Sequence, residues 1–179
     1  MRRLNTFLVI GIILSFILHS LSGSIRLLGA DAGSPKITAV ICIILVTFHV
    51  IITSALTVKT INSIRKSGKN YFRENIPFWT RRISGFALLI PLVIHLLIFK
   101  GTGDEAYRLV FFHTGRLISQ ILLIACLALH IITNLRPMLI GMGLKDRGLL
   151  SADIGFVLSV VLLFCCCAFC VYCLRWMAF

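Results

Sequence analysis

Acidic side chains are scarce in this 179-residue chain, in which six aspartates and glutamates stand against 18 lysines and arginines. All charged residues together make up only 13% of the chain, and they cluster between long apolar runs. Hydrophobic residues make up 59%, and the mean hydropathy is +1.01, whereas about half of the residues are apolar in a soluble domain. This composition excludes a soluble globular protein. It predicts an all-α, polytopic membrane protein of one domain, residues 1–179.

The polar loops also lack the Cys-x-x-Cys and Cys/His clusters that hold zinc, and no disulfide framework is indicated. All seven cysteines lie in apolar segments, and five of them fall between Cys165 and Cys173. In a membrane helix such residues are typical of close packing, with a thiol redox or metal patch as the alternative. The net charge of +12 predicts contact with anionic lipid headgroups rather than with nucleic acid.

Five apolar runs are long enough to cross a bilayer, which takes about 20 residues of helix. Charged or turn-forming segments separate them. We expect the first run to be a retained span rather than a cleaved signal peptide, because its histidine belongs to the pattern of the other spans. The predicted spans are residues 5–28, 37–58, 83–99, 117–135 and 154–174.

The basic residues are distributed unevenly about these spans. With the N-terminus inside, twelve of the 18 basic residues lie on the inner side and six on the outer side. The loop between the second and third spans supplies most of this difference. Because short inner loops are rich in lysine and arginine, the sequence predicts a cytoplasmic N-terminus and an external C-terminus in an inner (cytoplasmic) membrane.

Each of the first four spans contains one histidine, and an imidazole in hydrocarbon needs a functional reason. At about 1.5 Å of rise per residue, His19 and His95 lie roughly 24 Å and 20 Å from the nearest inner basic residue of their spans. For His49 and His130 the corresponding depths are roughly 15 Å and 9 Å. The depths therefore predict two pairs, His19 with His95 and His49 with His130.

Paired imidazoles from different helices are what bis-histidine haem ligation requires, because haem iron takes one ligand on each face. We therefore expect two b-type haems in a bundle of the first four spans. A hydrogen-bonded structural role for the histidines is the alternative. The fifth histidine, His113, is expected to be an interfacial side chain, or otherwise a proton relay near an outer quinone.

Three stretches resemble a known family. The third span is entered by Trp79-Thr-Arg-Arg-Ile-Ser-Gly85, the second contains Thr47-Phe48-His49, and the fourth reads Leu129-His130-Ile-Ile-Thr-Asn-Leu-Arg136. Together with the order and number of spans, they resemble the cytochrome b membrane anchors of succinate:quinone and fumarate:quinone oxidoreductases. The five-helix, two-haem branch is the most similar.

The resemblance implies that His19 and His95 ligate a distal, outer haem, and that His49 and His130 ligate a proximal, inner one. It further implies a flavoprotein subunit with FAD and an iron–sulfur subunit docked on the cytoplasmic side. Electrons would pass between these partners and a membrane quinone, and the branch that the chain resembles implies menaquinone. The chain itself would hold no dicarboxylate site.

Several polar residues are candidates for a haem propionate or a quinone. Arg82 and Ser84 match the family motif, and a guanidinium suits a propionate through paired hydrogen bonds. The alternative for the arginines is a simple positive-inside anchor. The remaining candidates are Arg136, Arg26 and Arg116.

Three other functions remain open at this point. One is the cytochrome b anchor of a different respiratory oxidoreductase, although such anchors often carry two histidine ligands on one span. Another is a thiol-linked quinone redox protein built on the cysteines. The last is a haemless transporter whose imidazoles line a proton path.

Overall fold

The computed structural model describes residues 2–30, 36–67, 75–100, 110–144 and 147–178 of the chain. Within these ranges the protein is all-helical, as predicted, and its five helices are long and apolar enough to span a membrane. The chain is therefore a multi-pass membrane protein. The helices are α1 (Arg2–Leu27), α2 (Lys36–Ser67), α4 (Ile76–Phe99), α5 (Thr114–Gly141) and α6 (Arg147–Met177).

The helices are longer than the predicted spans, mainly at the ends that carry charge. The third span was expected to begin at residue 83, but α4 begins at Ile76, where Pro77 stands in the first turn and suits a helix start. Pro91 and Pro137 lie inside α4 and α5, and neither helix ends there. The apolar runs therefore predicted the middle part of each helix. Beyond these runs the backbone stays helical in the charged segments at the helix ends.

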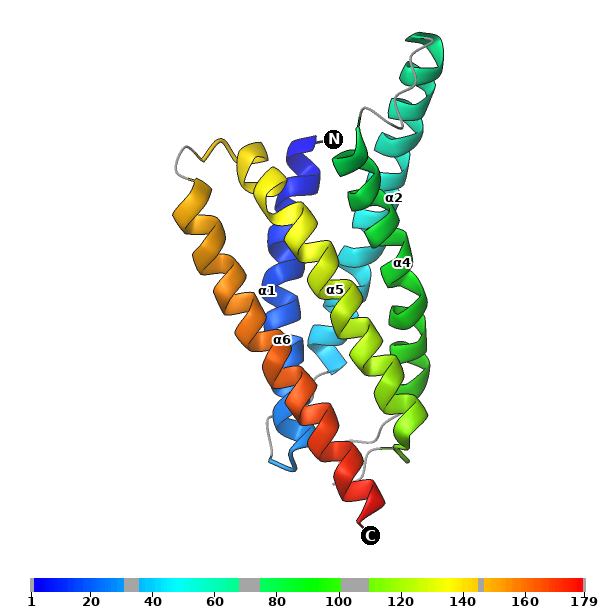
Figure 1. Cartoon of the computed structure of the whole chain (residues 1–179), viewed down its shortest axis with the longest axis vertical. Coiled ribbons are helices and arrows are strands. Elements are labelled where there is room, and N and C mark those ends of the chain that lie inside the picture. The colour runs from blue at the N-terminus through cyan, green and yellow to red at the C-terminus, as the bar shows by residue number, and fades with distance from the viewer. Residues whose placement is uncertain (1, 31–35, 68–74, 101–109, 145–146, 179) are drawn as a thin grey trace.

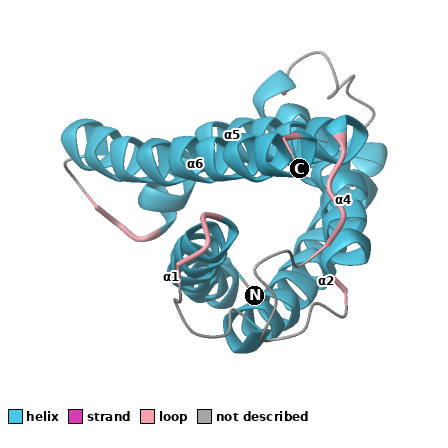
Figure 2. Cartoon of the chain, turned by 90° about the horizontal axis from the view of Figure 1, so that it is seen from below, coloured by secondary structure: helices cyan, strands magenta, loops and turns pink. Residues whose placement is uncertain are grey.

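The helices pack in a definite order. Close helix–helix packing joins α1 to α2, α4 to α5, α5 to α6 and α1 to α6, and α1 also touches α5. Figure 2 shows the result from one end, with α1, α2, α4 and α5 following one another around the bundle and α6 alongside α5. Among the described residues, α2 and α4 have no comparable backbone contact, although they are neighbours in this ring.

The two chain ends lie at opposite ends of the bundle, as an odd number of spans requires (Figure 1). Helix α2 projects beyond its neighbours at the end where the N-terminus lies. It has 32 residues, which corresponds to about 48 Å of helix, whereas the hydrocarbon core of a bilayer is about 30 Å thick. Its last turns carry the exposed side chains Lys59 and Lys66 outside the bundle.

The best-buried cluster lies at the other end, where aromatic rings join α6 to the segment that precedes α5. Phe112 is fully buried, and its ring stacks on that of Phe169 at a centroid distance of 6.1 Å. The hydroxyl of Tyr172 donates to the carbonyl of Val110 and accepts from its N–H, at 3.0 Å and 3.1 Å. Arg175 donates to the carbonyl of Leu28 at 2.6 Å and so caps the end of α1. These contacts close one end of the bundle.

Candidate functional site

The histidines of α1 and α4 meet inside the bundle. The ring centroids of His19 and His95 are 6.3 Å apart, and the ring planes are nearly perpendicular, at 88°. Their parent helices are not closely packed against each other. Two imidazoles thus approach across the interior from helices that do not otherwise associate, as the depth argument predicted for this pair.

The centroid separation of these two rings is compatible with two imidazoles on one iron, and equally with a direct edge-to-face contact. A metal–imidazole bond is about 2.0 Å long and the ring centre lies about 1.1 Å beyond the nitrogen, so two axial imidazoles have centroids about 6 Å apart. The measured separation of the His19 and His95 rings is 6.3 Å. Rotation of a ring about the ligand axis does not change this distance, so perpendicular planes are compatible with ligation.

His95 has a hydrogen-bond partner on α5. Its Nδ1 lies 2.7 Å from Oε1 of Gln120, a side chain with no exposed surface. An amide oxygen can only accept, so the imidazole proton is on Nδ1 and the lone pair is on Nε2. Histidines that bind metals are held in the same way, with the second nitrogen donating to an oxygen of the protein.

His130 of α5 lies against the entry of α4. Its Nδ1 is 3.2 Å from Oγ of Ser84 and 3.3 Å from Nδ2 of Asn134, and the hydroxyl of Ser84 also donates to the carbonyl of Arg81 at 3.1 Å. A Cβ on Gly85 would lie 3.1 Å from Cε1 of His130, closer than normal contact. Glycine thus lets this imidazole lie close to the backbone of α4 without the shift of a few tenths of an ångström that a Cβ would demand.

Two buried nitrogens near His130 have no hydrogen-bond partner among the described residues: Nδ1 of His49 and Nε of Arg82. The side chains of His49, His130 and Arg82 are close enough to interact electrostatically. The guanidinium of Arg82 also lies over the ring of Phe78, 5.2 Å from its centroid. The second histidine pair therefore shares its surroundings with a cation that has hydrogen-bonding capacity to spare.

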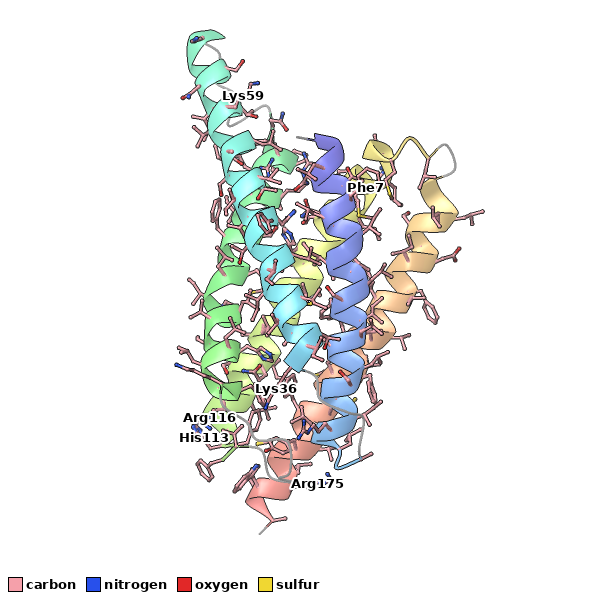
Figure 3. The ribbon with its side chains drawn as sticks, turned by 180° about the vertical axis from the view of Figure 1, so that it is seen from behind. Phe7, Lys36, Lys59, His113, Arg116 and Arg175 are labelled. Carbon is pink, nitrogen blue, oxygen red and sulfur yellow. The ribbon has the colours of Figure 1, made fainter. Side chains whose placement is uncertain are left out.

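The other predicted side chains lie apart from the two histidine pairs. His113 is exposed and caps the start of α5, where its Nδ1 accepts from the N–H of Gly115 at 3.1 Å. Arg116 donates to the carbonyl of Phe111 in the same turn. Both lie at the end of the molecule that also holds Arg175, away from Lys59 (Figure 3). The interfacial interpretation of His113 fits this position.

Two further arginines were candidates for binding a propionate or a quinone. Arg136 is exposed on α5, six residues beyond His130. Arg26 lies half-buried in the last turn of α1, near the end that carries His113. Both positions suit charged side chains at the ends of membrane helices.

The cysteines of α6 lie on both its buried and its exposed faces. Cys165 is buried, and its thiol lies 3.4 Å from Oγ of Ser24 on α1. Cys173 is buried as well, whereas Cys167 is exposed. Among the described residues there is no group of three or more histidine, cysteine or acidic side chains arranged to hold a metal ion. Packing between α1 and α6 accounts for Cys165, and it supports the packing interpretation there.

Gln120, Gly85 and Asn134 contribute to the histidine surroundings but were not singled out from the sequence. Asn134 follows His130 by one helical turn, and its Nδ2 donates to the carbonyl of His130 at 2.8 Å. Gln120 is a polar residue within an apolar run, which is the same signal that drew attention to the histidines. Gly85 was quoted as part of a motif, but its spatial role needed the structure.

The comparisons with known proteins give no assignment: no family model matches the chain, no curated protein is similar to it, and no solved structure matches its fold.

Proposed function

We propose that the chain is a two-haem cytochrome b subunit that passes electrons through the membrane. The observation that carries the proposal is the pair formed by His19 and His95, with ring centroids 6.3 Å apart and Nδ1 of His95 held by Gln120. The separation fits two axial ligands, and the hydrogen bond leaves Nε2 of His95 as the nitrogen that would bind iron.

The second pair supports a second haem of the same kind. Ser84 orients the ring of His130 from Nδ1, and Gly85 gives it room. The unpartnered Nε of Arg82 would bind an anionic propionate at this site, which a guanidinium suits. Buried polar groups in proteins nearly always have a hydrogen-bond partner. Two buried nitrogens that lie in the same part of the bundle and have no partner among the residues that the structure describes therefore favour a site for a bound polar group.

The residues of the chain would have three tasks. His19, His95, His49 and His130 would hold two irons at two depths, and Gln120 would keep His95 in the tautomer that exposes Nε2. Ser84 would help to orient the ring of His130. The apolar helices would exclude water and set the dielectric around the site. Haem, when bound, supplies the one-electron chemistry.

The direction and partners of electron transfer form the finer part of the proposal. Helix α2 projects beyond the bundle with Lys59 and Lys66 exposed, which offers a basic surface to a partner at that end. We propose that an iron–sulfur subunit and a flavoprotein with FAD dock there, on the cytoplasmic side. The electron carrier in the membrane would be a quinone, with menaquinone expected, and the chain would anchor a succinate dehydrogenase or fumarate reductase.

The haem content of the purified chain tests the proposal. After expression with adequate haem, we expect two b-type haems per chain in a pyridine haemochrome assay. His95→Ala and His49→Ala should each lose about half of this haem, because each substitution removes one axial ligand of one pair. His113→Ala is the matched control, since this histidine is exposed and caps α5, and it should keep both haems.

A chain that folds in the membrane but has no Soret band would overturn the proposal. That result would favour a haemless transporter, in which the same imidazoles line a path for protons. Loss of haem from His113→Ala with retention in His95→Ala would equally contradict the assignment of the ligands.

A further inference from the structure

Gln120 is the most deeply buried polar side chain of the membrane bundle among the described residues, with no exposed surface. Burying an amide in apolar surroundings is unfavourable unless its donors and its acceptor have partners. The side chain lies in the second turn of α5 and contacts His95 of α4. The presence of an amide at this buried position therefore has to be explained by the groups that it binds.

A directional chain of hydrogen bonds fixes the orientation of this amide. Oγ of Ser119 donates to the carbonyl of Arg116 at 2.7 Å, so it is left to accept from Nε2 of Gln120, at 3.1 Å. The amide nitrogen is thereby held on the Ser119 side. Oε1 is then directed to Nδ1 of His95, at 2.7 Å. Because Ser119 fixes which end of the Gln120 amide is the donor, the amide oxygen faces His95 and accepts the proton carried by Nδ1.

From this chain we infer that Gln120 is the positioning residue of the outer histidine pair: it fixes the tautomer and the ring orientation of His95 and makes Nε2 more basic. The inference rests on the proposed function, because its consequence is an effect on the haem held by His19 and His95. A hydrogen bond from the distal nitrogen of a ligand raises ligand basicity, which stabilises oxidised iron and lowers the reduction potential.

The two pairs differ in this respect. Nδ1 of His95 faces an amide oxygen at 2.7 Å, whereas Nδ1 of His130 faces the hydroxyl of Ser84 at 3.2 Å and the amide nitrogen of Asn134 at 3.3 Å. The shorter bond to a fixed acceptor gives the stronger polarisation of the ring. Because Gln120 contacts a histidine of one pair, its replacement should affect the haem of that pair and not the other haem, and this difference provides the test.

The test is a redox titration of the haem bands in the purified chain with Gln120→Met, which keeps the length of the side chain and removes the acceptor. We expect the potential of one haem to rise and that of the other to stay unchanged. A tenfold shift in the ratio of oxidised to reduced haem corresponds to about 59 mV for one electron. Ser84→Ala is the matched control and should move the other haem instead.

A second variant grades the effect. Ser119→Ala keeps the acceptor but removes the group that orients the amide, so it should shift the same haem in the same direction by less. If Gln120→Met leaves both potentials at the wild-type values, or shifts both equally, the inference is wrong even though two haems are bound.

A measurement without haem separates this inference from the proposed function. In the haem-free chain, ¹⁵N NMR of labelled histidines should report a proton on Nδ1 of His95, and Gln120→Met should return this ring to the mixture of tautomers of a free imidazole. The same tautomer in both proteins would overturn the role of Gln120. Absence of haem from the wild-type chain would overturn the proposed function and leave this readout in force.

Discussion

The nitrogens Nδ1 of His49 and Nε of Arg82 are buried near each other with no hydrogen-bond partner among the described residues. Leaving a buried donor or acceptor unsatisfied costs about 1–3 kcal/mol. These two groups thus carry an unfavourable free energy that a bound group with acceptor oxygens would relieve at Arg82. At the scale of single residues, this is the strongest indication that the second pair is a binding site.

Gly85→Ala should weaken haem binding at the pair formed by His49 and His130. The new Cβ would lie 3.1 Å from Cε1 of His130, so the ring has to shift by a few tenths of an ångström from the position in which it faces Ser84. Loss of such a supporting contact lowers affinity at metal sites by about 10–100-fold. The measurement is haem content under limiting haem, together with the absorption bands of the remaining haem.

Gly23→Ala is the control for this substitution, because nothing lies within 4 Å of a Cβ at that helical position. It should keep both haems and, as a glycine-to-alanine change inside a helix, stabilise the protein slightly. Equal haem loss from both variants would contradict the role assigned to Gly85.

The approach of His19 to His95 was predictable from the sequence, whereas the partners of the rings were not. Depth along a membrane helix is proportional to residue number, so two histidines at similar depth were expected at one level. Gln120 stands out in the sequence as a polar residue within an apolar run, but the sequence does not show which group its amide faces. Only the packing of α5 on α4 directs its amide inward. Haem ligation by the four histidines stays a prediction.

At the scale of elements, the predicted spans agree with the helices in their middle parts and differ at their ends. The fourth span was expected over residues 117–135, but α5 runs from Thr114 to Gly141. Its start is fixed by the cap at His113, and its end by a turn in which Gly143 has a φ of 78°. Hydropathy records the boundary of the hydrocarbon, and capping decides where the helix stops.

Tyr172→Phe should loosen the join between α6 and the segment before α5. The ring remains, but both hydrogen bonds of the hydroxyl with Val110 are lost. We expect a cost of about 1–2 kcal/mol, because two modest hydrogen bonds disappear together. The checks are the midpoint of thermal unfolding in detergent and faster hydrogen exchange at Val110 and the residues that follow it.

Thr47→Val is the control for this change, since its hydroxyl is exposed and bonds only to the carbonyl of Ile43 in its own helix. It should leave both the midpoint and the exchange of Val110 as they are in the wild type. Unaltered exchange in Tyr172→Phe would mean that ring packing alone holds the segment.

At the scale of the whole molecule, the five helices place the two termini at opposite ends of the bundle. The distribution of basic residues in the sequence predicts that the N-terminus is inside, which stays a prediction. Alkaline phosphatase fused after Met177 should be active, because this enzyme matures outside the cytoplasm, and the same reporter at the N-terminus should be inactive. A fluorescent reporter that matures only in the cytoplasm should give the opposite pattern. Activity of both phosphatase fusions would contradict five spans.

Among the described residues, α2 and α4 pack less closely than the other neighbouring pairs of the ring, which makes one side of the bundle different from the rest. Helices in a bilayer are held together mainly by interlocking atoms, so a pair with little such contact separates with the least loss. The packed helix pairs on either side, α1 with α2 and α4 with α5, would stay intact if α2 and α4 separated. A flat prosthetic group could thus slip in sideways from the lipid after the chain has been inserted, and detergent would begin to pull the protein apart along the same line.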